Sequence, residues 1–282
     1  MKLSVFTVAT PDLTSEQLLS TAKAAGFEGV EWRYKSVSEE LKSAPLSFWG
    51  NHLCSIPEYG SEADWNFYKD ASEAQGLQIL SVTPYITAGD LEETERVLKV
   101  AKYLGARFIR LGVPRYDRTK HFNELFELER TYIREAEALC KQYGVKGLVE
   151  THHVTIAASA SATYRIIEGR DPNAIGVLFD PCNMVYEGFE NYRMGLELLG
   201  PYVAHVHMKN ASWAQTGTND DGSAVWSAGW ASLKQGIVPW KQVIDDLKAT
   251  GYDGWIGFED FSKEEPTEQK LHQFVQYVRS LL

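Results

Sequence analysis

Cysteine, positive charge and long apolar runs are all scarce in this chain of 282 residues. Three cysteines (Cys54, Cys140 and Cys182) are too few for a disulfide framework and fit a reducing compartment. The formal net charge of −10 argues against a broad grip on nucleic acid or an anionic membrane, but a small anionic substrate needs only a local positive site. No stretch approaches the roughly 20 apolar residues of a membrane helix. We therefore expect a cytoplasmic protein with neither nucleic acid nor membrane as partner.

Short β-rich runs alternate with helical patterns along the whole chain. The expected strands are residues 3–9, 29–34, 77–85, 107–113, 145–151, 174–180, 202–209 and 255–260, and the expected helices are 14–25, 61–75, 91–105, 122–143, 159–169, 189–199, 240–249 and 267–281. Strands separated by helices predict parallel pairing with right-handed crossovers. Eight such pairs predict a (β/α)₈ barrel with 1–282 as a single domain. An open doubly wound sheet is the alternative, weakened because no G-x-G-x-x-G follows the first strand.

Polar residues end four consecutive expected strands, at the end of a barrel where active sites lie. The segments are LVETHH, VLFDPCN, AHVHMKN and GFEDF, and they supply Glu150, Asp180, His205 with His207, and Glu259 with Asp260. Each residue alone has a structural explanation: an ion pair for Glu259, a helix cap for Asp180, a core position for His205. Together, carboxylates and an imidazole on adjacent strand ends predict one divalent metal ion, with Mn²⁺, Mg²⁺ or Co²⁺ preferred and Zn²⁺ as a further candidate.

These segments, with the opening LSVFTV and the closing GIVPWKQVIDDLKATGYDGWIGFED, resemble the xylose-isomerase-like barrel superfamily of sugar (phosphate) isomerases and epimerases. The resemblance spans nearly the full length. It implies that the metal ligands are Glu150, Asp180, His207 and Glu259, with His205 one layer deeper in the barrel. It also implies that Glu150 and Glu259 act as acid and base, moving a proton next to the carbonyl of a sugar or sugar derivative.

Four further residues are candidates for substrate binding. His152 forms a Glu-x-His pair with Glu150, and Lys209 follows the second histidine at the expected mouth. Asn183 and Trp213 stand where ketohexose 3-epimerases of this superfamily have a histidine and an arginine. A further glutamate of those epimerases is Ile156 here, so their typical substrate contacts are missing.

The segment between strand seven and the next helix, residues 210–239, is long for a loop, and such loops are often functional. Its Trp213, Trp226 and Trp230 either cover the mouth and stack on a sugar or form a subunit interface, which makes a homo-oligomer a candidate state. Trp49 and His52, after strand two, raise the same alternatives.

The sequence therefore predicts a metal-dependent sugar isomerase or epimerase with a sugar or polyol substrate. Two alternatives remain open: a metal-dependent keto-inositol-type dehydratase, and a non-catalytic sugar-binding barrel. A DNA-repair endonuclease is disfavoured, because that chemistry uses three zinc ions and histidines that this chain lacks, as at Asn183.

Overall fold

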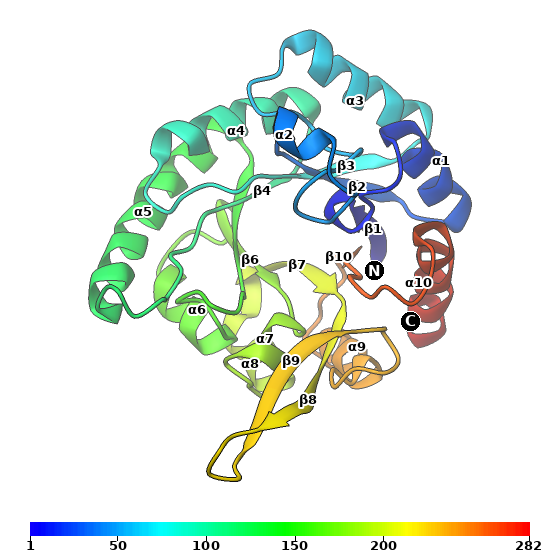
Figure 1. The fold of residues 1–282 in the computed structure, drawn as a ribbon. Coiled ribbons are helices and arrows are strands. Elements are labelled where there is room, and N and C mark those ends of the chain that lie inside the picture. The colour runs from blue at the N-terminus through cyan, green and yellow to red at the C-terminus, as the bar shows by residue number, and fades with distance from the viewer.

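The computed structural model describes residues 1–282 and contains a closed barrel of eight parallel strands (Figure 1). The barrel strands are β1 (Lys2–Phe6), β2 (Gly29–Arg33), β3 (Gln78–Thr83), β4 (Phe108–Arg110), β5 (Lys146–Glu150), β6 (Ile175–Phe179), β7 (Val203–Met208) and β10 (Trp255–Phe258). Strands β1 to β7 follow one another around the ring, and β10 pairs with both β7 and β1 to close it. The predicted (β/α)₈ barrel is confirmed.

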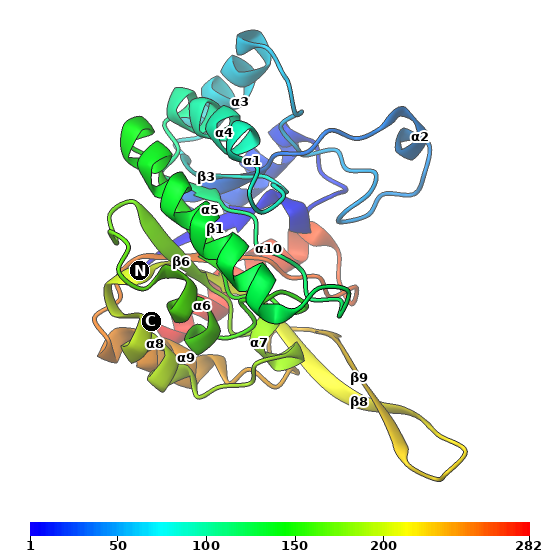
Figure 2. The ribbon, with the colours of Figure 1, turned by 90° about the vertical axis from the view of Figure 1, so that its left-hand side faces the viewer.

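Helices surround the barrel, one after each barrel strand in sequence (Figures 1 and 2). The long helices are α1 (Ser15–Ala25), α3 (Glu62–Ala74), α4 (Leu91–Leu104), α5 (Phe122–Tyr143), α6 (Ala160–Ile167), α8 (Tyr192–Leu199), α9 (Trp240–Ala249) and α10 (Thr267–Leu281). The short helical segments are η1 (Thr7–Ala9), α2 (Glu39–Lys42), α7 (Asn183–Tyr186) and η2 (Gly200–Tyr202). Local sequence sets the helix ends: Thr14 and Gln17 form a capping box at the start of α1, and Gly26 ends it with a φ of 100°.

Side chains that point into the barrel form an apolar floor beneath a polar rim. Leu80, Phe108, Leu148, Leu178 and Trp255 make a buried cluster separate from the main core. Residues two positions apart in a strand share a face. Three members of this cluster therefore lie directly below Arg110, Glu150 and Asp180, so the polar residues rest on packed apolar side chains.

Every barrel strand is shorter than predicted, and the first and the fourth show the physical reason. The first strand ends at Phe6, and Thr7–Ala9 forms a 3-10 turn. The fourth covers only Phe108–Arg110 of the expected 107–113. In both places pairing with the neighbouring strands ends at the barrel rim, and apolar β-prone residues beyond it enter loops.

The segment 210–239 is not an irregular loop, which corrects the expectation from its length. It contains an antiparallel ribbon of β8 (Asn210–Thr218) and β9 (Ala224–Ala231), which projects away from the barrel (Figure 2). The sequence signal was present, because β-prone runs flank Asp-Gly at 221–222, and Gly222 takes a φ of 84° in the turn.

One face of this ribbon carries all three of its tryptophans. Trp230 lies opposite Ala211, Ala228 opposite Trp213, and Trp226 opposite Gln215. Residues directly opposite in an antiparallel pair share a face, and alternate pairs repeat it. Trp230 is at the base of the ribbon, whereas Trp226 lies farther out with 57% of its surface exposed.

All three cysteines are buried and unpaired, as expected from the absence of a disulfide framework. None of the helices combines the length and apolar composition that crossing a membrane requires.

Glu129, in α5, is a buried carboxyl whose contribution to the stability of the core can be tested. Its side chain is fully buried, and neither carboxyl oxygen has a hydrogen-bond partner. Burial raises the pKa of Glu129 well above its usual value. The folded state therefore takes up this proton more readily than the unfolded chain does, so stability falls as pH rises through the interval between the two pKa values.

We expect Glu129→Leu to raise the free energy of unfolding at pH 8 by about 1–3 kcal/mol, the usual penalty of an unsatisfied buried polar group. The gain should shrink at pH 5, where the wild-type carboxyl is closer to neutral in both states. Denaturant unfolding at both pH values measures it, with the exposed Glu135→Leu as control. An equal effect at the two pH values would contradict burial of an ionisable carboxyl as the cause.

Candidate active site

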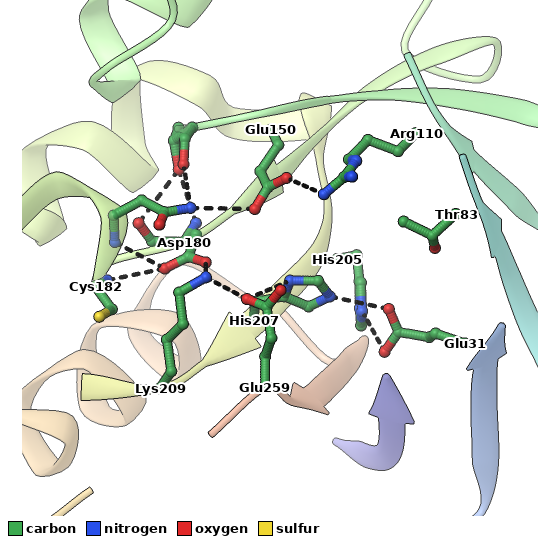
Figure 3. A network of polar contacts seen from close by, with 12 residues as sticks. Glu31, Thr83, Arg110, Glu150, Asp180, Cys182, His205, His207, Lys209 and Glu259 are labelled. Atoms are coloured by element: carbon green, nitrogen blue, oxygen red, sulfur yellow. Dashed lines mark hydrogen bonds and ion pairs between the residues drawn. The ribbon is translucent and has the colours of Figure 1, made fainter. Parts of the chain in front are cut away.

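Four ligand-type side chains converge at the carboxyl ends of the barrel strands. They are Glu150 at the end of β5, Asp180 after β6, His207 in β7 and Glu259 after β10. One ligand atom from each lies within 4.8 Å of the others, and all four residues are buried (Figure 3). The four residues selected from the sequence are thus brought together.

The surrounding chain orients two of these carboxylates. Arg110 Nη1 donates to Glu150 Oε2 at 2.8 Å, and Asn183 Nδ2 donates to Glu150 Oε1 at 3.1 Å. Burial opposes ionisation of Glu150, but the positive charges of Arg110 and of neighbours that include Lys209 together outweigh it and hold the pKa of Glu150 below its usual value. Asp180 Oδ1 accepts the backbone N–H groups of Cys182 and Asn183, both at 3.0 Å, which leaves Oδ2 directed at the site.

His207 is held between two carboxylates. Its Nε2 lies 2.9 Å from Glu31 Oε2, and its Nδ1 lies 3.2 Å from Glu259 Oε2. Burial lowers the pKa of the imidazole, but Glu259 and Glu31 more than compensate and raise the pKa of His207 to about 10. A hydrogen bond from Nε2 to Glu31 turns Nδ1 toward the other ligand-type residues.

Sequence reasoning missed Glu31, which joins both histidines of the HVH motif. Its other oxygen lies 2.9 Å from His205 Nε2, one layer deeper in the barrel, and Ser4 Oγ donates to it at 2.7 Å. Burial favours the neutral form, yet the two histidines keep the pKa of Glu31 well below its usual value. A Cβ added at Gly257 would lie 2.4 Å from Glu31 Oε1, so the glycine makes room for this carboxylate. The available signal was charge at alternate positions of GVEWR, a strand otherwise fully buried.

Lys209 lies inside the site rather than at its edge. Its ammonium is 2.6 Å from Asp180 Oδ2 and pairs with Glu259 Oε2. Burial disfavours the charge, but Asp180 and Glu259 raise the pKa of Lys209 above its usual value. The rings of Trp230 and Phe261 each lie 5.5 Å from the ammonium nitrogen. Lys209 thus compensates the carboxylates from within the site.

The residues fit a single divalent cation. His207 Nδ1 and Asp180 Oδ2 are buried and lack an aligned hydrogen-bond partner, although both contact charged neighbours. Three carboxylates and one imidazole are a donor set suited to Mn²⁺, Mg²⁺, Co²⁺ or Zn²⁺. Such an ion would relieve the repulsion among the three carboxylates.

A cavity of about 470 Å³ opens above these residues. Glu150, Glu259 and Lys209 are in its wall, together with aromatic residues. The aromatic lining is Phe6, Trp49, Tyr85, Trp230 and Phe261. A larger hollow, about 1000 Å³, lies around the amino ends of the strands near Lys146 and Tyr252, and none of the four ligand-type residues lines it. The smaller cavity is therefore the candidate substrate site.

The predicted substrate-binding residues separate into two groups. His152 and Lys209 line the cavity, and His152 stacks on His153, their ring centroids 4.5 Å apart. Asn183 does not line it and instead donates to Glu150. Trp213 is also outside, because it lies farther along the ribbon than Trp230, and its indole donates to Val185 O at 2.8 Å. Asn183 and Trp213 thus lie outside the cavity wall in this structure, and their contact with substrate stays a prediction.

The protein is thus a (β/α)₈ barrel in which four residues of the types that bind metal ions lie together above an apolar floor. The sequence profile of the family described as xylose isomerase-like TIM barrel matches residues 19–281. The chain belongs to this family.

This chain aligns with curated relatives and with solved structures over nearly its full length. The chain is 22% identical to an inosose dehydratase of Geobacillus thermodenitrificans, covering 95% of this chain and 90% of that one. It is 23% identical to an inosose dehydratase of Clostridium botulinum, covering 91% and 86%. The probable 3-DHS dehydratase AsbF of Bacillus anthracis superposes with a TM-score of 0.71 at 18% identity, covering 99% of both chains. A D-tagatose 3-epimerase-like protein reaches 0.71 at 16% identity, covering 100% of this chain and 97% of the other. At such identities these structures share the fold.

Asp180→Ala should abolish metal binding, since it removes a ligand-type oxygen and leaves Lys209 without one of its carboxylates. Elemental mass spectrometry of protein purified without chelator and then exposed to Mn²⁺ should find about one equivalent in the wild type and much less in the variant. Asp260→Asn is the control, because Asp260 is buried nearby but accepts from Ser262 N instead. Equal metal in wild type and Asp180→Ala would rule out this ligand set.

Glu31→Gln should weaken Mn²⁺ binding about 10- to 100-fold, the usual effect of losing a carboxylate that orients a ligand histidine. Competition with a chelating dye measures the dissociation constant, and the exposed Glu28→Gln is the control. A folded Glu31→Gln protein with unchanged affinity would limit Glu31 to a structural role.

Proposed function

We propose that this protein is a divalent-metal-dependent enzyme that removes a proton next to the carbonyl of a keto polyol or sugar derivative and eliminates water. The observation that carries this proposal is the convergence of Glu150, Asp180, His207 and Glu259 at the base of an aromatic-lined cavity. A divalent ion bound by these residues would polarise the substrate carbonyl.

The chain supplies the groups for the proton transfer. Arg110, with Lys209, lowers the pKa of Glu150, and Lys209 with His207 lowers that of Glu259, so both carboxylates are ionised and either can accept a proton. The substrate C–H bond breaks, its proton passes to the carboxylate, and its electron pair moves toward the carbonyl oxygen. As a C=C bond forms, the C–O bond of the β-hydroxyl breaks. The carboxyl returns the proton to that hydroxyl, and water leaves with no oxidation or reduction.

Two further observations favour elimination. Both curated relatives described above are inosose dehydratases, and their alignments cover 95% and 91% of this chain. In addition, three positions correspond to substrate contacts in the ketohexose epimerases of this superfamily, and none of them lines the cavity. Ile156 is buried, and Asn183 and Trp213 lie outside the cavity wall.

Epimerisation or isomerisation is the second candidate, as the sequence first predicted. Glu150 and Glu259 come from strands separated by β6 and β7, and Figure 3 shows them on different sides of Asp180 and Lys209. Two carboxylates placed in this way can remove a proton on one side of a bound sugar and return it on the other.

We expect Glu150→Gln and Glu259→Gln each to lower kcat about 10²- to 10⁴-fold on the preferred substrate, the range for loss of a positioned acid or base. The assay incubates Mn²⁺-loaded protein with keto-inositols and ketoses and analyses the products by mass spectrometry. Product lighter by one water identifies a dehydratase, whereas a product of unchanged mass and new stereochemistry identifies an epimerase or isomerase.

The metal content of each variant is measured beside its activity, with Asp260→Asn as control. Full activity in either folded glutamate variant would contradict its role as acid or base. Ligand binding without turnover of any compound would instead favour a non-catalytic sugar-binding barrel.

A further inference from the structure

Charged residues at the mouth of the barrel are separated by sign. The carboxylates Glu150, Asp180 and Glu259 come from the ends of β5, β6 and β10. On the other side, Arg33 ends β2 and Arg110 ends β4, and Arg115 follows in the next loop. The carboxylates therefore gather on one side of the candidate substrate cavity, around Lys209, and the arginines on the other, with the Arg110–Glu150 ion pair where the two sides meet.

Arg33 is the unusual member of the basic side. It is 2% exposed, and it shares the inward face of β2 with Glu31, two positions earlier. Its Nη1 donates to Ser55 Oγ at 2.8 Å and its Nη2 to Trp49 O at 3.3 Å, but Nε has no partner. No carboxylate forms an ion pair with Arg33. A buried cation without a carboxylate is destabilising, so its presence suggests an anion that arrives with a ligand.

Tyr85 connects Arg33 to the cavity. The guanidinium carbons of Arg33 and Arg110 lie 5.7 Å and 5.1 Å from the centroid of its ring. Tyr85, Arg110 and Arg115 line the cavity, and Trp49, whose carbonyl accepts from Arg33, lines it as well. Arg33 therefore lies directly behind the cavity wall, where its charge is screened little by water.

The charges around the cavity do not balance once a metal is bound. Four carboxylates (Glu31, Glu150, Asp180 and Glu259) face four side-chain cations (Arg33, Arg110, Arg115 and Lys209). A divalent ion adds two positive charges even if His207 becomes neutral as its ligand. The loaded site therefore carries excess positive charge, although the whole chain is acidic.

His52, a titratable residue that shares a hydrogen-bond partner with Arg33, does not alter this balance. Its Nδ1 lies 3.1 Å from Ser55 Oγ, the acceptor of Arg33. Burial, followed by the charge of Arg33, lowers the pKa of His52 to about 4. His52 is therefore neutral at physiological pH.

We propose that the substrate of this site carries a carboxylate, held on the side of Arg110 and Arg115 with the field of Arg33 behind it, while its carbonyl faces Glu150 and Glu259. A carboxylate suits the site because guanidinium groups match its planar geometry, and because barrels bind phosphates largely through backbone N–H groups. The inference rests on the proposed function and specifies its substrate class as a polyhydroxy keto acid.

Quinate and myo-inositol serve as probes, since both are cyclohexane polyols and only quinate has a carboxylate. Isothermal titration calorimetry with Mn²⁺-loaded protein should show quinate binding at least about tenfold more tightly at low salt, with the advantage shrinking as NaCl is added. Equal affinity, tighter binding of myo-inositol, or no binding of either probe would overturn the carboxylate inference.

Variants test whether the basic side causes this preference. Arg33→Met should reduce quinate affinity about tenfold and leave Mn²⁺ affinity unchanged, whereas Arg33→Lys, which keeps the charge, should retain most of the preference. Arg115→Met should weaken quinate binding in the same way. Because Arg115 is exposed, this variant remains informative if Arg33→Met does not fold. Lys35→Met is the control, because Lys35 pairs with Glu58 outside the cavity. Unchanged quinate binding in Arg115→Met and in any folded Arg33→Met would overturn the inference.

The outcomes also separate this inference from the proposed function. If the protein converts neutral keto polyols but binds quinate no better than myo-inositol, the proposed enzymatic activity is supported and the inference of a substrate carboxylate is rejected. Failure of the wild type to bind any divalent ion would reject the proposed function itself.

Discussion

Packing three carboxylates at one end of a closed barrel requires positive charge among them. In this structure Lys209 and His207 supply it: the lysine contacts Asp180 and Glu259, and the imidazole lies between Glu259 and Glu31. Removal of one partner from such a buried network leaves an uncompensated charge, which is strongly destabilising. The network therefore constrains both the orientation of the ligand-type residues and the composition of the strands that carry them.

Residues below and above this charged network are also selected by it. Below it, the carboxylate oxygens of Glu31 lie 2.9 Å from Nε2 of His205 and 2.9 Å from Nε2 of His207, and Gly257 leaves the space that this carboxylate occupies. Above it, the rings of Trp230 and Phe261 cover Lys209 and limit water around the charges. A poorly hydrated, prearranged set of charges is the environment in which a metal ion and a proton acceptor act most strongly on a bound carbonyl.

The cavity adds a second level of organisation to this arrangement. Its acidic side provides ligand-type carboxylate oxygens, and its basic side carries arginines grouped around Tyr85. The two sides come from different halves of the ring of strands, and they are linked where Arg110 of β4 binds Glu150 of β5 and where Glu31 of β2 contacts His207 of β7. Solved structures that share this fold are described as a probable dehydratase and as an epimerase-like protein, so the fold alone does not fix the reaction.

Local patterns in the sequence determined the barrel and the four converging residues. Alternating apolar periods and glycine helix ends placed the elements, and the position of Glu150, Asp180, His207 and Glu259 at strand ends placed them together, because parallel strands end at one rim. Tertiary structure alone decided the rest. Glu31 joins His207 across 176 residues, Lys209 turns inward to the carboxylates, and Trp230 rather than Trp213 reaches the cavity. Such contacts depend on strand stagger, local register shifts and ribbon alternation, which arise only when distant segments pair, so no single stretch of sequence contains them.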